Sequence, residues 1–323
     1  MRVSLRVSSL PLILLVFSMF AYSQNVIATI PVGTSPVGLA VNDNTNTIYV
    51  ANHESNTVSV IDGGTNAVVA TIPVGPGPGP ILAYVPANLI YVNNTGDRTM
   101  TVIDGNSNAV LKTVPLPFAI TGWTELGLSK FVYVADNLAN QVRVVDITRL
   151  KVVTTITVTR PVFVTANAKG KLVYVSTLLS TILVIDGSTN TVINTFTLGA
   201  GTNFLMMSVD TVHNRLFVAT YPAAGGPASV AILDATTGAE RGTTPSLGAV
   251  YAVQALSTGT AVAAGGDTQG AYVHSAIFIN ERNAQVTGML DVGDVPIAVG
   301  YHAASGMIYI ANGVSNTVSV ISD

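Results

Sequence analysis

The chain of 323 residues contains no cysteine, and only 10% of its residues are charged. A typical soluble domain has about 25% charged residues, so Thr, Asn, Val and Gly must form much of this surface. Without cysteine the chain can form no disulfide, and it cannot attach haem through a Cys-x-x-Cys-His motif. A domain of this size buries enough apolar surface to fold without disulfides.

Charge of either sign is scarce as well as unclustered. The formal net charge is −3, and the 14 basic residues are scattered along the sequence. Proteins that bind nucleic acid usually gather Lys and Arg on one face or along one helix. We therefore expect no nucleic-acid partner.

Long apolar runs are missing after residue 23, because Asn, Asp, Gly or Thr interrupts each one. Within residues 1–23, Arg2 and Arg6 precede an apolar run from Leu10 to Ala21, and small residues stand before Gln24. This layout is typical of a secretory signal peptide. The alternative is a membrane anchor, but the run is shorter than the roughly 20 residues that span a bilayer. We expect residues 24–323 to be exported to the periplasm, the cell surface or the extracellular space, with no transmembrane segment.

The dominant feature that the sequence does have is a repeat. The segment Ile48–Asp62 returns as Ile308–Ser322, with 11 of 15 positions identical across an offset of 260 residues. The residue at the centre of this strand recurs at intervals of 41 to 47 residues, as Tyr49, Tyr91, Tyr133, Tyr174, Phe217, Val262 and Tyr309. Self-similarity with such a period indicates a repeat architecture. The sixth unit is degenerate.

Each unit contains four short runs rich in β-branched and aromatic residues, separated by Gly, Asn, Asp, Pro or Ser. In the first unit we expect strands at Pro36–Val41, Thr47–Ala51, Thr57–Ile61 and Ala67–Val74. Four antiparallel strands in about 42 residues correspond to one propeller blade. The sequence therefore predicts an all-β, seven-bladed β-propeller formed by residues 24–323.

Two details of this propeller can be predicted. Asp62-Gly63 and Asp104-Gly105 are expected to form tight hairpin turns with glycine at positive φ. The aromatic series is expected to fill the interfaces between blades, because central strands are covered on both faces.

The two ends of the chain predict how the ring closes. The segment Asn25–Gly33 matches Asn66–Gly75, which contains the fourth strand of the first unit. The chain ends just after a third strand, Thr317–Ile321. We expect the N-terminal strand to complete the last blade, because this pairing removes two open sheet edges.

The repeated words Tyr-Val-x-Asn, Thr-Val-Ser-Val-Ile-Asp and Ala-Thr-Ile-Pro-Val-Gly resemble the repeats of the YVTN β-propeller family. The resemblance covers nearly all of residues 24–323 and is weaker in the fifth and sixth units. It implies a seven-bladed fold, within a broader group that includes lactonase-like enzymes, surface-layer proteins and secreted binding proteins. The family motif is structural, so the resemblance implies no catalytic residue.

Candidate ligand-binding residues lie where the units differ. The loops between second and third strands share one rim of the channel with the loops between blades, and such loops vary freely on a rigid scaffold. The candidates on this rim are His53, Glu54, Asp97, Arg98, Asp136, Arg160, Tyr221, Asp267 and Asp294. They predict a site for a polar ligand or a cation, or one where His53 acts as general base on a lactone. Exposed loops carry charges in any case, so each residue also has a purely structural explanation.

Trp123 and Glu125 are further candidates, because the other blades have aliphatic residues in the corresponding innermost strand. Their i, i+2 spacing places them on one face of that strand. If this face points into the channel, the carboxylate would have a raised pKa and could be functional. The alternative is a glutamate solvated by channel water beside a packing tryptophan.

Two classes of function remain open. The sequence favours a non-enzymatic binding or scaffold protein, a monomer that holds an unidentified protein or a small polar ligand at the channel mouth. We expect no cofactor and no metal, because no pair of histidines has the spacing of a zinc site. The alternative is a lactonase-like hydrolase, which requires His53, Glu54 and Arg98 to converge in one pocket.

Overall fold

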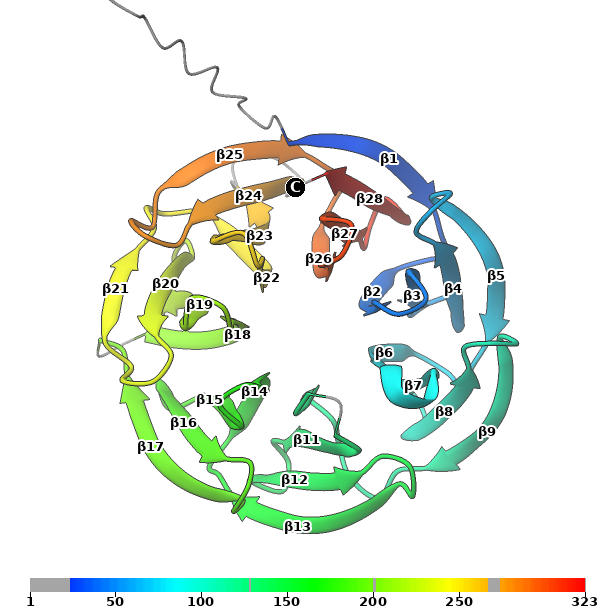
Figure 1. Cartoon of the computed structure of the whole chain (residues 1–323), viewed down its shortest axis with the longest axis horizontal. Coiled ribbons are helices and arrows are strands. Elements are labelled where there is room, and N and C mark those ends of the chain that lie inside the picture. The colour runs from blue at the N-terminus through cyan, green and yellow to red at the C-terminus, as the bar shows by residue number, and fades with distance from the viewer. Residues whose placement is uncertain (1–23, 128, 200–201, 267–273, 323) are drawn as a thin grey trace, which may run out of the picture.

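The computed structural model describes residues 24–127, 129–199, 202–266 and 274–322. The expected signal peptide and the candidate Asp267 lie outside these ranges. The described residues form seven four-stranded antiparallel sheets, arranged as blades around a central axis (Figure 1). The predicted all-β, seven-bladed β-propeller is confirmed. No helix in the described ranges is long and apolar enough to cross a membrane.

The strands of each blade follow the chain from the axis outward. Blade 1 contains β2 (Pro36–Asn42), β3 (Thr47–Asn52), β4 (Thr57–Asp62) and β5 (Ala67–Pro73). Blade 2 contains β6 (Pro78–Tyr84), the short 3-10 helix η1 (Val85–Ala87), β7 (Leu89–Asn94), β8 (Thr99–Asp104) and β9 (Ala109–Pro115). Blade 3 contains β10 (Gly122–Glu125), β11 (Phe131–Asp136), β12 (Gln141–Asp146) and β13 (Lys151–Thr157). Blade 4 contains β14 (Pro161–Asn167), β15 (Leu172–Thr177), β16 (Thr181–Asp186) and β17 (Thr191–Thr197).

The remaining three blades complete the ring. Blade 5 contains β18 (Thr202–Asp210), β19 (Arg215–Pro222), β20 (Ser229–Asp234) and β21 (Glu240–Thr243). Blade 6 contains β22 (Ala249–Ala255), β23 (Thr260–Gly266), β24 (Ser275–Asn280) and β25 (Val286–Asp291). Blade 7 contains β26 (Pro296–His302), β27 (Met307–Asn312), β28 (Thr317–Ser322) and, from the other end of the chain, β1 (Asn25–Pro31).

The ring closes as the sequence predicts. β1 pairs antiparallel with β28, so Thr29 lies opposite Ser319 and Ile30 opposite Val318. Figure 1 shows the two strands, blue and dark red, side by side at the outside of blade 7. The pairing covers an edge of the last sheet that would otherwise be open.

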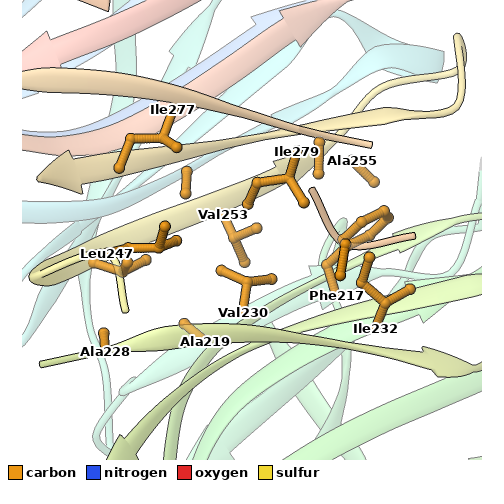
Figure 2. Close-up of a cluster of buried hydrophobic side chains, with 14 residues drawn as sticks. Phe217, Ala219, Ala228, Val230, Ile232, Leu247, Val253, Ala255, Ile277 and Ile279 are labelled. Atoms are coloured by element: carbon orange, nitrogen blue, oxygen red, sulfur yellow. The ribbon is translucent and has the colours of Figure 1, made fainter. Parts of the chain in front are cut away.

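The core lies between neighbouring blades. Residues of the aromatic series are at most 2% exposed, which confirms their predicted packing role. Between blades 5 and 6, side chains of β19 and β20 such as Phe217 and Val230 meet Val253 of β22 and Ile277 of β24 (Figure 2). Because both faces of the second and third strands are covered in this way, these strands are almost continuously apolar.

The turn after the third strand differs from the prediction. Gly63 does not have a positive φ; the left-handed residue is Asn66, at φ 53°. Oδ1 of Asp62 accepts hydrogen bonds from the backbone N–H groups of Gly64 and Thr65, at 3.1 and 2.7 Å, and so holds a longer turn. Gly63 is small for a different reason: a Cβ there would collide with the carboxamide of Asn46. The prediction of a tight Asp-Gly turn was therefore wrong.

Candidate functional site

The innermost strands of all seven blades surround a central channel with a volume of about 590 Å³. Apolar side chains are the more numerous in its wall, with Val37, Leu39, Ile81, Trp123, Phe163, Met206 and Ile297 among them. Its polar side chains are those of Thr121, Thr124, Thr165, Ser208, Tyr251 and Gln254. Among the described residues that line the channel, none is Asp, Glu, Lys, Arg or His. The channel can therefore offer hydroxyl and amide groups to a ligand, but no formal charge from its wall.

The structure places His53 in the loop after β3, where it links blades 1 and 2. Its backbone N–H donates to the carbonyl of Ser35 at 2.8 Å. Its ring Nδ1 lies 3.2 Å from the carbonyl oxygen of Pro78. Because a carbonyl only accepts hydrogen bonds, this contact makes Nδ1 the protonated nitrogen. Only Nε2 is left as a possible base.

The other groups needed by a hydrolase are exposed at the mouth. Glu54, Asp97 and Arg98 all lie at the surface. Asp97 caps its own loop, since Oδ1 accepts from Oγ1 of Thr99 at 2.7 Å. Among the residues that the structure describes, no hydrogen bond or ion pair joins His53, Glu54 and Arg98, so contacts do not assemble them into one pocket.

Asp136 points into blade 3 instead of forming part of the rim. The side chain is 2% exposed, and Nε and Nη2 of Arg143 both lie 2.8 Å from Oδ2 of Asp136 in an ion pair. The Arg143 guanidinium also lies 4.9 Å from the centre of the Phe118 ring. In blade 1 the equivalent positions are Asn52 and Ser59, whose side chains are hydrogen bonded at 3.0 Å. Asp136 and Arg143 thus replace a neutral structural pair by a charged one.

The remaining rim candidates make contacts that position loops. Arg160 is exposed, with a left-handed backbone at φ 51°. The backbone N–H of Asp294 donates to Oγ of Ser315 at 2.7 Å. The phenol of Tyr221 hydrogen bonds to both the carbonyl and the N–H of Val250, and so joins blade 5 to blade 6. The predicted polar ring is therefore not held together by contacts among its described members.

Trp123 and Glu125 both belong to β10, but they have different surroundings. Trp123 lines the channel and packs against a buried cluster that includes Tyr84 and Tyr91 of blade 2. Glu125, at the end of β10, is not among the residues that line the channel. Its Oε2 is buried and has no hydrogen-bond partner. Burial raises the pKa of this carboxyl to about 7.

Sequence reasoning missed a second cluster, on the opposite rim between blades 5 and 6. Asp210, His213 and Glu281 place one ligand atom each within 4.8 Å of one another. A hydrogen bond to Asp210 raises the pKa of His213 above its usual range. Burial raises the pKa of Glu281. A comparison of the repeats could have pointed to this cluster. Glu281 directly follows the third strand, and the other blades have uncharged residues there, namely Gly63, Gly105, Ile147, Gly187 and Ala235.

Comparisons with known proteins support the fold alone. No family model matches the chain, and no curated protein matches it. Among solved structures, the chain is similar to one described as Kuenenia stuttgartiensis Hydrazine Synthase, with a TM-score of 0.78 and 16% sequence identity. The match covers 90% of this chain and 96% of that chain. At this identity the shared feature is the propeller architecture, and function does not follow from it.

Proposed function

We propose that this protein is an exported YVTN-type β-propeller that binds a ligand or a partner segment without converting it, at the mouth and within the central channel. One observation carries the proposal. All seven blades contribute to one channel of about 590 Å³, lined by apolar side chains together with hydroxyl and amide groups, a size and composition typical of small-molecule sites.

The composition of the wall favours a neutral ligand with an apolar body. An ion that enters the channel loses hydration, and the described wall offers no opposite charge in return. Hydroxyl groups such as those of Thr124 and Tyr251 can satisfy a few hydrogen bonds and so orient the ligand. The ligand that we propose is therefore neutral, with an apolar body and a few polar groups, while the small polar ligand expected from the sequence stays a prediction.

The hydrolase alternative lacks contacts that bring His53, Glu54 and Arg98 together. Nδ1 of His53 donates to Pro78, while Glu54 and Arg98 extend into solvent. The Pro78 carbonyl orients the His53 ring, but no hydrogen bond or ion pair among the described residues brings Glu54 or Arg98 to it. We therefore propose binding as the function and retain lactone turnover as an outcome of the test.

Export and a monomeric state are parts of the same proposal. Export rests on the basic, apolar and small-residue segments of residues 1–23. It predicts a mature protein that begins at Gln24, which N-terminal sequencing of the secreted or periplasmic fraction would test.

The channel is tested by filling it. Ala298 lines the channel, so Ala298→Trp should block it, whereas Ala67→Trp adds the same side chain to the exposed outer strand β5. Ligand-observed NMR with neutral aromatic fragments, each paired with a carboxylate analogue, would report binding. We expect neutral fragments to bind the parent chain and the Ala67 variant but not the Ala298 variant. Equal binding by both variants would refute the channel as the site.

A lactone panel tests the alternative directly. We expect no turnover by the parent chain. Turnover that disappears in His53→Ala and persists in His274→Ala would replace the binding proposal with the hydrolase.

A further inference from the structure

The cluster on the rim opposite His53 unites residues from two blades. Asp210 is the last residue of β18, His213 lies in the following turn, and Glu281 follows β24 of the neighbouring blade. Nδ1 of His213 lies 2.7 Å from Oδ2 of Asp210 and 3.4 Å from Oε2 of Glu281. One imidazole nitrogen thus faces two carboxylate oxygens.

Both carboxylates are deeply buried, while the histidine remains open to solvent. Asp210 is 4% exposed and Glu281 is 5% exposed, against 37% for the side chain of His213. Oε2 of Glu281 is buried and accepts no hydrogen bond, and its one ion-pair contact among the described residues is Nδ1 of His213 at 3.4 Å. A buried carboxylate oxygen without a donor is costly, so this oxygen is a position where a cation would be stabilised. The exposed edge of His213 provides a route for an ion to enter.

Blade 6 makes room for Glu281 because it has a large residue after the third strand and glycine in the inner turn, which is the reverse of blade 1. In every blade from 1 to 6, the residue after the third strand donates its backbone N–H to a residue in the inner turn. In blade 1 these residues are Gly63 and Asn46, and the asparagine side chain occupies the shared space. In blade 6 they are Glu281 and Gly259, which has a φ of 86°. The carboxylate of Glu281 fills the space, 3.3 Å from the position of a Gly259 Cβ.

We propose that Asp210, His213 and Glu281 bind a divalent metal ion of the zinc type. Imidazole nitrogen together with carboxylate oxygen suits zinc and its transition-metal neighbours, whereas calcium and magnesium prefer oxygen ligands alone. Ligands at about 2.0–2.2 Å from one ion lie about 3–4 Å apart, so small side-chain movements bring the three atoms into place. Three protein ligands leave a fourth position on the exposed side of the ion.

Arg215 is the nearby charge that opposes a cation. Its Nη1 donates to the carbonyl groups of His213 and Asn214, at 3.0 and 3.2 Å, which directs part of the guanidinium towards the backbone. Two ionised carboxylates and one guanidinium leave a negative cluster when His213 is neutral. Arg215 therefore weakens the attraction of this cluster for a divalent ion but does not turn it into repulsion.

Zinc titration of the metal-free full chain tests the site. A competition assay with a chromophoric zinc indicator should give one tight zinc ion per chain. We expect His213→Ala and Glu281→Gln each to weaken this binding at least tenfold. His274→Ala, which removes another solvent-accessible histidine, should leave it unchanged. Circular dichroism would verify that all variants are folded.

Cobalt provides a second readout that is independent of folding stability. Co²⁺ added to the parent chain should produce visible absorption bands of a low-coordinate site, and these bands should be absent in His213→Ala. Equal zinc affinity in the parent chain and His213→Ala, or no cobalt bands in the parent chain, would overturn the metal site.

Discussion

Replacing Glu125 by glutamine should stabilise the protein at alkaline pH and leave its stability unchanged in acid. Glu125 ends β10, and its Oε2 is buried without a hydrogen-bond partner. Desolvation raises the pKa of the folded carboxyl to about 7, compared with 4.5 for an ordinary glutamate. Glutamine has nearly the same shape and carries no charge, so it removes the ionisation while it changes the size of the side chain little.

The direction of the pH effect on stability depends on which state, folded or unfolded, binds the proton of Glu125 more tightly. Below pH 4.5 the carboxyl is protonated in both the folded and the unfolded chain, so burial of a charge costs nothing. As pH rises from 4.5 to 7, the unfolded chain releases its proton first, and the free energy of unfolding falls. Above pH 7 the loss is complete, and it amounts to at most about 3 kcal/mol.

Urea unfolding at a series of pH values from 4 to 9 measures this effect. The difference in midpoint between Glu125→Gln and the parent chain should be near zero at pH 4 and grow to its maximum above pH 8. Glu54→Gln is the matched control, because Glu54 is exposed on the rim. Parallel pH profiles for the Glu125 variant and the parent chain would refute the burial of this carboxylate.

Two further predictions follow from buried polar groups within the blades. Tyr49→Phe should leave the free energy of unfolding unchanged or slightly raised, because the Tyr49 hydroxyl is buried without a partner. Tyr133→Phe should lower it by about 1 kcal/mol, because that hydroxyl donates to Oδ1 of Asn190 at 2.6 Å; equal urea midpoints for the two variants would contradict this contrast. Arg143→Met should cost about 3–5 kcal/mol, because the buried Asp136 carboxylate loses the guanidinium that forms its ion pair. The double variant Asp136→Asn/Arg143→Ser should recover most of that loss by reproducing the Asn52–Ser59 pair; a double variant as unstable as Arg143→Met would count against the equivalence.

The architecture could be predicted from the sequence because each blade repeats the same physical pattern. The strands of blade 1 end within a residue of their predicted bounds, and the match between Asn25–Gly33 and Asn66–Gly75 correctly predicted the closing strand. These features depend on the regular repeat of short apolar runs and on edges that must be paired, and both can be read along the chain.

The site was harder to predict because its contacts join residues far apart in sequence or on different blades. The sequence predicted Asp136 as a charge on the rim, but its carboxylate is paired with Arg143, seven residues later in the chain. Comparing both positions across the repeats would have found this pair, since blade 1 has Asn52 and Ser59 there. The contact between His213 and Glu281 depends on how blades 5 and 6 pack, which no local spacing reveals.

The closed ring is the central claim, because the channel and both rims depend on it. The chain has no cysteine, so Asn25→Cys/Ser322→Cys introduces a single possible disulfide between residues that are paired in β1 and β28. Paired antiparallel residues lie about 4.5–5.5 Å apart at Cα, within the range of a disulfide. After mild oxidation, mass spectrometry and thiol titration should find an intramolecular disulfide and no free thiol in this variant. The control variant Asn25→Cys/Asp104→Cys, whose two positions are not paired, should keep two free thiols. Two free thiols in the paired variant, or disulfides only between molecules, would contradict a ring closed by the N-terminal strand.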